Sequence, residues 1–125
     1  MYYCIITRIA KLDLALMMID LEKIQNLFIE GKYEKVLKIV DEKLLVENNN
    51  ISLLNIKGMV HSVKKEYDDS IICFKKCILL DDTKSSVYSN LAYSFIGLND
   101  NEKAIENFIL SISGTPKNTR PMRFL

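Results

Sequence analysis

The feature that most constrains the fold is a residue pattern that recurs after 34 positions. Four pairs of residues are related by this offset, and the members of each pair share their character: small, small, aromatic and turn-forming. In that order the pairs are Gly58 and Ala92, Ser70 and Ala104, Phe74 and Phe108, and Asp82 and Pro116. A period near 34 predicts helix–turn–helix units that stack in a row, because one such unit cannot bury its apolar face alone.

Apolar residues at helical spacing predict six helices, with turn residues between them. The expected ranges are 12–29, 33–46, 51–63, 67–80, 85–96 and 101–113. Gly31 and Asn99 suit left-handed corners after helices, whereas Asn50 and Asp100 suit helix caps. No stretch alternates between apolar and polar residues as a strand does. The fold class is therefore predicted to be all-α.

The second copy of the pattern carries a specific set of residues. It reads Tyr88-x2-Leu91-Ala92-x2-Phe95, then Ala104-x3-Phe108, then Pro116. This pattern resembles the tetratricopeptide repeat. The resemblance implies a right-handed solenoid of about three repeats, at 17–50, 51–84 and 85–118, of which the first is degenerate. The second repeat departs from the family pattern at Lys57, His61 and Asp82.

The two ends of the chain lie outside this pattern. Residues 1–16 either lengthen the first helix, because Leu12, Leu14 and Ala15 stay in phase with it, or precede a natural start at Met17 or Met18. Residues 119–125 form a short basic tail.

Charge and cysteine content exclude several classes of function. The chain has 17 Lys and Arg against 16 Asp and Glu, a net charge of +1, which leaves no electrostatic footprint for duplex nucleic acid. Three cysteines without a framework of spacings favour a reduced, cytoplasmic protein. No apolar run is long enough for a membrane span, and no secretory signal is expected.

The resemblance also implies a ligand surface, because the first helices of successive repeats line a concave groove in this family. Carried over by alignment, the groove would comprise Met18, Leu21, Glu22, Gln25, Phe28, Ser52, Asn55, Met59, Ser62, Ser86, Ser89, Asn90 and Tyr93. Relatives that clamp a carboxylate use Lys, Arg and Asn there. The corresponding slots in this chain hold Leu21, Gln25, Ile56, Ser86 and Asn90.

The clamp is thus essentially absent, and a buried carboxylate would lack a compensating cation. We therefore expect a neutral, partly apolar peptide or helix as partner. Asn55 and Asn90 would bond its backbone, and Met59 and Tyr93 would pack on its side chains. Such a module would act as an adaptor, co-chaperone or regulator.

No constellation of residues predicts catalysis, a cofactor or a metal. Cys73 and Cys77 lie four apart on one helix, but His61 is the only histidine and lacks a paired spacing, so core packing is the better interpretation. Gly-rich phosphate loops, nucleophile elbows and His-Glu motifs are missing from the sequence. The chain is therefore predicted not to be an enzyme.

The last helix suggests a second interaction. Its apolar residues Ile105, Phe108, Ile109 and Ile112 have no following helix to cover them. Either Met122, Phe124 and Leu125 fold back on this face, or a second subunit covers it, which gives a homodimer.

A self-assembling structural subunit is accordingly the alternative function, and an RNA-binding helical repeat is a weaker one. Replacing Met59 and Tyr93 by Ala separates the first two functions, because only the adaptor would lose its partner.

Overall fold

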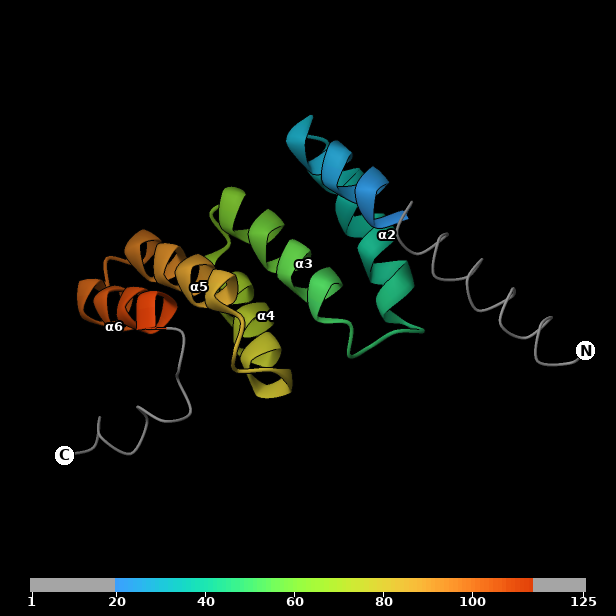
Figure 1. The fold of residues 1–125 in the computed structure, drawn as a ribbon. Helices are drawn as coiled ribbons and strands as arrows, with labels where there is room; N and C mark the ends of the chain where they lie inside the picture. The colour runs from blue at the N-terminus through green and yellow to red at the C-terminus, as the bar shows by residue number, and fades with distance from the viewer. Residues whose placement is uncertain (1–19, 114–125) are drawn as a thin grey trace, which may run out of the picture.

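The computed structural model describes residues 20–113 (Figure 1). A first helical segment covers residues 20–29, and five further helices follow it. They are α2 (Tyr33–Leu44), α3 (Ile51–Val63), α4 (Tyr67–Leu80), α5 (Ser85–Gly97) and α6 (Asn101–Ser113). Residues 20–113 contain no strand, so the all-α prediction is confirmed. The expected residues 12–19 of the first helix lie outside the described range.

The predicted helix bounds need two small corrections. The second helix was expected to reach residue 46, but α2 ends at Leu44, and Leu45 and Val46 are exposed turn residues. Among residues 20–113 nothing buries their apolar side chains, which are 85% and 86% exposed, so packing gives the helix no reason to include them. Conversely, α5 continues one residue further than expected, to Gly97.

The same corner recurs at the end of every first helix. Gly31, Lys65 and Asn99, each 34 residues apart, have φ of 79°, 64° and 62°. In each corner the next residue's N–H bonds the carbonyl five positions back, for example Glu66 to His61 at 2.8 Å. This is the Schellman arrangement, in which a left-handed residue ends a helix and satisfies its last carbonyls. The prediction that Gly31 and Asn99 adopt a left-handed backbone is confirmed. Lys65 adopts the same conformation, which was not predicted.

Both predicted helix caps are also present. The Asn50 side chain accepts a hydrogen bond from the Leu53 N–H at 3.2 Å, at the start of α3. The Asp100 carboxylate accepts one from the Lys103 N–H at 3.2 Å, at the start of α6. Each cap satisfies a backbone donor that the first turn of a helix leaves unpaired.

Successive helices pack side by side in one row, as a solenoid requires (Figure 1). The row buries two apolar clusters. One lies between the first helical segment, α2 and α3 and contains Ile24, Val36, Val40, Leu53, Ile56 and Val60. The other lies between α3, α4, α5 and α6 and contains Leu54, Ile71, Phe74, Cys77, Val87, Leu91, Phe95 and Ala104. The core is thus continuous along the row, with α3 contributing to both clusters.

Small residues let α3 and α4 approach closely. A Cβ atom placed on Gly58 would lie 2.5 Å from Phe74 Cε1, so the ring of this fully buried phenylalanine occupies the space that a side chain would need. One helix pair further on, Ser70 of α4 and Ser94 of α5 are both fully buried, and their hydroxyls are 2.8 Å apart. Gly58 therefore lies where α3 and α4 approach closely, and the Phe74 ring fills the space beside it.

The sequence departures at Lys57 and His61 do not disturb the packing. Lys57 Nζ lies 2.8 Å from an Asp41 carboxylate oxygen of α2, and the pKa of Lys57 is raised, chiefly by this hydrogen bond. His61 Nδ1 lies 2.9 Å from Glu66 Oε1. Polar contacts thus stand at two of the positions where the second repeat departs from the family pattern.

Candidate functional site

Two adjoining hollows lie along the first helices of the repeats. The larger has a volume of about 420 Å3 and is lined by Gln25, Phe28, Ile29, Ser52, Asn55, Ile56 and Met59. The smaller has a volume of about 210 Å3 and is lined by Phe28, Met59, Ser62, Val63, Phe74, Asn90 and Tyr93. Because Phe28 and Met59 line both, the two hollows form one continuous surface, which we call the groove.

An amide pair joins two successive repeats inside the groove. Asn90 Nδ2 of α5 donates a hydrogen bond to Asn55 Oδ1 of α3, at 3.1 Å. Both side chains are half-buried. This bond uses one donor of Asn90 and one acceptor of Asn55. The Asn55 amino group and the Asn90 carbonyl oxygen therefore keep hydrogen-bonding capacity, a donor and an acceptor next to each other.

The structure brings together most of the residues that the alignment placed on this surface. Gln25, Phe28, Ser52, Asn55, Met59, Ser62, Asn90 and Tyr93 all line the groove. Ile56, which occupies one of the clamp slots, also lines the groove, and sequence reasoning missed three further lining residues, namely Ile29, Val63 and Phe74. They are apolar, so their periodicity indicated only core packing.

Other predicted residues lie elsewhere. Glu22 lines a separate hollow of about 290 Å3 together with Lys23, Asn26, Leu27 and Glu30. Ser86 and Ser89 line neither hollow of the groove, and the Ser89 hydroxyl donates to the Ser86 carbonyl at 2.9 Å. Leu21 packs against the first apolar cluster. Met18 is outside the described residues.

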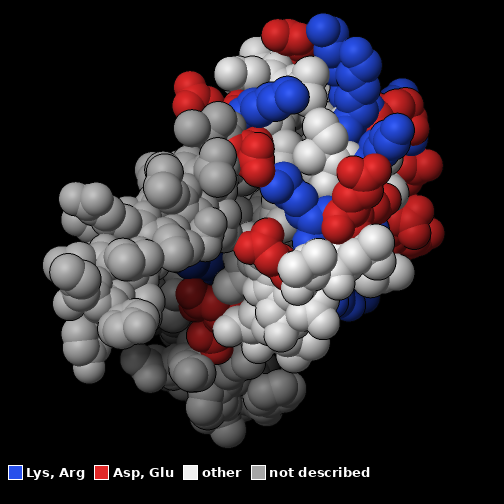
Figure 2. All heavy atoms as spheres, turned by 90° about the vertical axis from the view of Figure 1, so that its right-hand side faces the viewer, with Lys and Arg blue, Asp and Glu red and all other residues white. Residues whose placement is uncertain are grey.

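The lining of the groove carries no charged side chain. Charges are instead paired on other surfaces, and Figure 2 shows acidic and basic side chains intermixed on the face at the α2 end of the row. Lys43 Nζ lies 2.8 Å from an Asp20 oxygen, and Lys64 Nζ lies 2.6 Å from a Glu34 oxygen. The groove is therefore polar through amides and hydroxyls alone.

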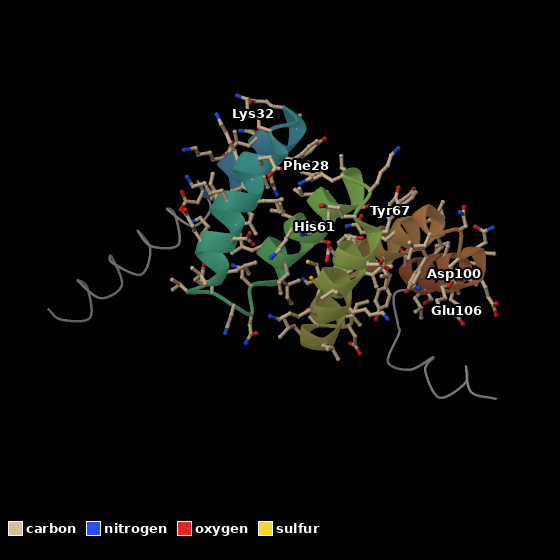
Figure 3. The ribbon with its side chains drawn as sticks, turned by 180° about the vertical axis from the view of Figure 1, so that it is seen from behind. Phe28, Lys32, His61, Tyr67, Asp100 and Glu106 are labelled. Atoms are coloured by element: carbon tan, nitrogen blue, oxygen red, sulfur yellow. The ribbon has the colours of Figure 1, made fainter. Side chains whose placement is uncertain are left out.

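One side-chain cluster escaped the sequence analysis. His61, Glu66 and Asp69 place one possible ligand atom each within 4.8 Å of one another. Figure 3 shows His61 near the middle of the row, seen from behind. The hydrogen bond from His61 is the main reason that the pKa of Glu66 lies below its ordinary value. Helical spacing could not predict this cluster, because His61 lies before the corner at Lys65 and the two acidic residues lie after it.

The two described thiols are core groups, as predicted. Cys73 and Cys77 are free and buried, and Cys77 is fully inaccessible. Burial raises the pKa of both thiols, that of Cys77 to about 11. A thiol that stays protonated near neutral pH is a poor nucleophile and a poor metal ligand. Within residues 20–113 no helix has the length and apolarity needed to cross a membrane.

Solved structures with this fold are found among helical-repeat proteins. One is the second TPR of Spaghetti (RPAP3) bound to the HSP90 peptide SRMEEVD, with a TM-score of 0.68 and 20% identity over 73% of this chain and 84% of that one. Another is the type III secretion translocator chaperone SycD of Yersinia enterocolitica, with a TM-score of 0.72 and 13% identity over 83% of this chain and 80% of that one. At these identities the likeness concerns the fold.

Comparison with curated protein sequences gives no match. The family model for the tetratricopeptide repeat matches twice, at residues 51–84 and 85–118, which together make up more than half of the chain. These two segments correspond to α3 with α4 and to α5 with α6. A degenerate first repeat at 17–50 stays a prediction. The chain belongs to the tetratricopeptide repeat family.

Proposed function

We propose that this protein is a non-enzymatic interaction module whose groove holds a neutral, partly apolar peptide or helix of a partner protein. The observation that carries the proposal is the lining of the groove, which combines apolar side chains with amides and hydroxyls and has no charge. A partner segment with an unpaired charge would lose hydration there without a compensating ion pair.

The Asn55–Asn90 pair would read the backbone of the bound segment. With one hydrogen bond already joining them, these side chains are held in place and keep N–H donors and carbonyl acceptors for a bound segment. A peptide unit presents the complementary acceptor and donor. Met59 and Phe28, which line both hollows, would contact apolar side chains on either side of that unit.

The solved structure bound to SRMEEVD gives a useful contrast. That heptapeptide carries three acidic side chains, and here the groove offers no Lys or Arg to meet them. We therefore expect this chain to bind neutral apolar peptides in preference to SRMEEVD. The proposal thus includes a role as adaptor, co-chaperone or regulator toward a partner of different chemistry. A cytoplasmic location is part of it, supported by the free thiols Cys73 and Cys77.

Affinity capture followed by peptide arrays of the captured proteins would test the proposal. The groove variant should be Met59→Ala with Asn90→Ala, because Tyr93 also contacts Phe108 of α6, at 5.2 Å between ring centroids. The matched control is Ile72→Ala with Lys76→Ala, two exposed α4 residues outside the groove. We expect the groove variant to lose the captured proteins and the control to keep them. Equal capture by both variants, or bound peptides that are mostly acidic, would refute the proposal.

A second candidate function is self-assembly through the last helix. The specific observation in its favour is exposure: the side chains of Ile105, Ile109 and Ile112 on α6 are 59%, 58% and 86% exposed. This surface is distinct from the groove, so the two functions are compatible.

A further inference from the structure

The cluster of His61, Glu66 and Asp69 brings together donor atoms from both sides of one corner. His61 lies in the last turn of α3, Glu66 directly precedes α4, and Asp69 lies in the first turn of α4. One possible ligand atom from each residue lies within 4.8 Å of the other two. An imidazole nitrogen with two carboxylate oxygens is a donor set that suits a divalent transition metal such as Zn²⁺. We call these three residues the corner triad.

The corner itself holds two of the three donors in place. The Glu66 N–H bonds the His61 carbonyl at 2.8 Å, as part of the Schellman arrangement. The same two residues also meet through their side chains, with 2.9 Å between His61 Nδ1 and Glu66 Oε1. The imidazole is only 16% exposed, so packing limits the positions that its ring can adopt. Donors that are already ordered lose little conformational entropy when they bind an ion.

The third donor is available for a ligand. The Asp69 side chain is exposed, and within the described part of the chain its carboxylate makes no hydrogen bond or ion pair. Two lysines act on the triad, but each has a closer partner on another element. Lys57 pairs with α2, and Lys64 Nζ lies 2.6 Å from Glu34 Oε1 but 3.8 Å from Glu66 Oε1. Neither lysine therefore neutralises both carboxylates, and the triad keeps negative charge that a cation would offset.

We propose that the corner triad binds one Zn²⁺ ion through His61 Nδ1 and one oxygen each of Glu66 and Asp69, with water completing the coordination. Donor atoms in a tetrahedral zinc site lie about 3.4 Å apart, because each is about 2.1 Å from the ion. The present spread of up to 4.8 Å is larger. Rotation of the exposed Asp69 side chain closes the difference without moving either helix.

The ion would join the end of α3 to the start of α4. None of the three ligands lines the groove, so this site is separate from the proposed partner surface and does not depend on it. Because the unfolded chain does not hold the three donors together, Zn²⁺ should stabilise the folded protein by mass action. The site thus adds a metal-dependent clasp to the second repeat.

Competition for Zn²⁺ against a chromophoric chelator would test the site in the full chain, without a histidine tag. Cys4 is replaced by Ser throughout, so that its thiol does not bind the ion. The key variant is Asp69→Asn. The matched control is Asp68→Asn, because Asp68 is exposed in the same helical turn but is not in the triad. We expect Asp69→Asn and His61→Gln to weaken Zn²⁺ binding at least tenfold, and Asp68→Asn to weaken it less than twofold.

NMR of the imidazole ring would show directly whether His61 is a ligand. It is the only histidine of the chain, so its ring signals are free of overlap with another imidazole. We expect one equivalent of Zn²⁺ to shift these signals in the parent chain and in Asp68→Asn, and to raise the Tm of both. The proposal would be overturned by a chain that does not compete for Zn²⁺, by equal weakening in the two aspartate variants, or by ring signals that stay unchanged. Binding of Mg²⁺ as tight as that of Zn²⁺ would also overturn it, since Mg²⁺ prefers oxygen ligands.

Discussion

The close contact between Gly58 and Phe74 makes a quantitative prediction for Gly58→Ala. The new Cβ would lie 2.5 Å from Cε1 and 2.8 Å from Cζ of the Phe74 ring, whereas carbon atoms pack best about 3.5–4.0 Å apart. The ring or the helix must therefore move by about 1 Å. Phe74 is 0% exposed, so it has no open space to enter.

The expected magnitude is the difference between two opposing terms. Overpacking a core typically costs about 1–3 kcal/mol, and replacing Gly by Ala inside a helix contributes about 1 kcal/mol of stability. With a contact this short we expect the upper part of the first range, and hence a net loss of about 1–2 kcal/mol. That loss corresponds to a fall in Tm of roughly 5–10 °C for a domain of this size.

Denaturant unfolding followed by circular dichroism at 222 nm would measure the change. Phe74→Leu in the same chain should relieve the clash, so the double variant should be more stable than the sum of the single losses predicts, by about 1 kcal/mol. Gly97→Ala is the control, because its Cβ would also meet a ring, that of Tyr67, but Tyr67 is only half-buried and can move. If Gly58→Ala is as stable as the wild type or more so, the helices do not approach as closely as described.

Three further predictions concern single interactions. Lys65→Gly should raise the free energy of unfolding, measured by urea titration, by about 0.5–1 kcal/mol. The reason is that φ of 64° costs a residue with a side chain about 1–2 kcal/mol, whereas it costs glycine little. A lower free energy of unfolding would contradict this reasoning. The hydrogen bond from His61 lowers the pKa of Glu66 in the folded protein. This hydrogen bond therefore stabilises the fold fully when the pH is above the unfolded-state pKa of Glu66, about 4.3. The stabilisation disappears as the pH falls through the lower folded-state pKa. The stability difference between wild type and Glu66→Gln should therefore vanish in acid, and a difference that grows as the pH falls would be the wrong sign. Ser70→Ala should lower the stability measured by thermal unfolding by about 1 kcal/mol. Adding Ser94→Ala should lower it by less than about 1 kcal/mol more, because the two buried hydroxyls bond each other and the first substitution already removes that bond. Strictly additive losses would show that the two residues are not coupled.

The sequence was sufficient to predict the fold because the same physical need recurs after each repeat. Gly58, Ala92 and Ala104 mark where helices must approach, and these residues are buried in the structure. A turn was expected between residues 63 and 67, but the left-handed backbone of Lys65 was not predicted, since lysine does not favour that conformation. Its conformation follows from the Schellman bonds that it shares with the corners at Gly31 and Asn99.

The candidate site was predicted less completely than the fold. Alignment placed Asn55 and Asn90 on one surface, but their mutual hydrogen bond depends on how successive repeats are rotated, which spacing alone does not give. The same limit applies to Lys57 and Asp41, which meet across α2 and α3. Ile29 and Val63 line the groove although their apolar character suggested only core positions.

The uncharged lining of the two hollows has a kinetic consequence. Without a local field to steer a partner, encounter should proceed at the unassisted rate of about 10⁵–10⁶ M⁻¹s⁻¹ and vary little with ionic strength. Discrimination among segments would then reside in how long each one stays bound, which depends on the fit of its side chains beside Met59 and Phe28. Such a protein would select its clients by residence time rather than by speed of capture.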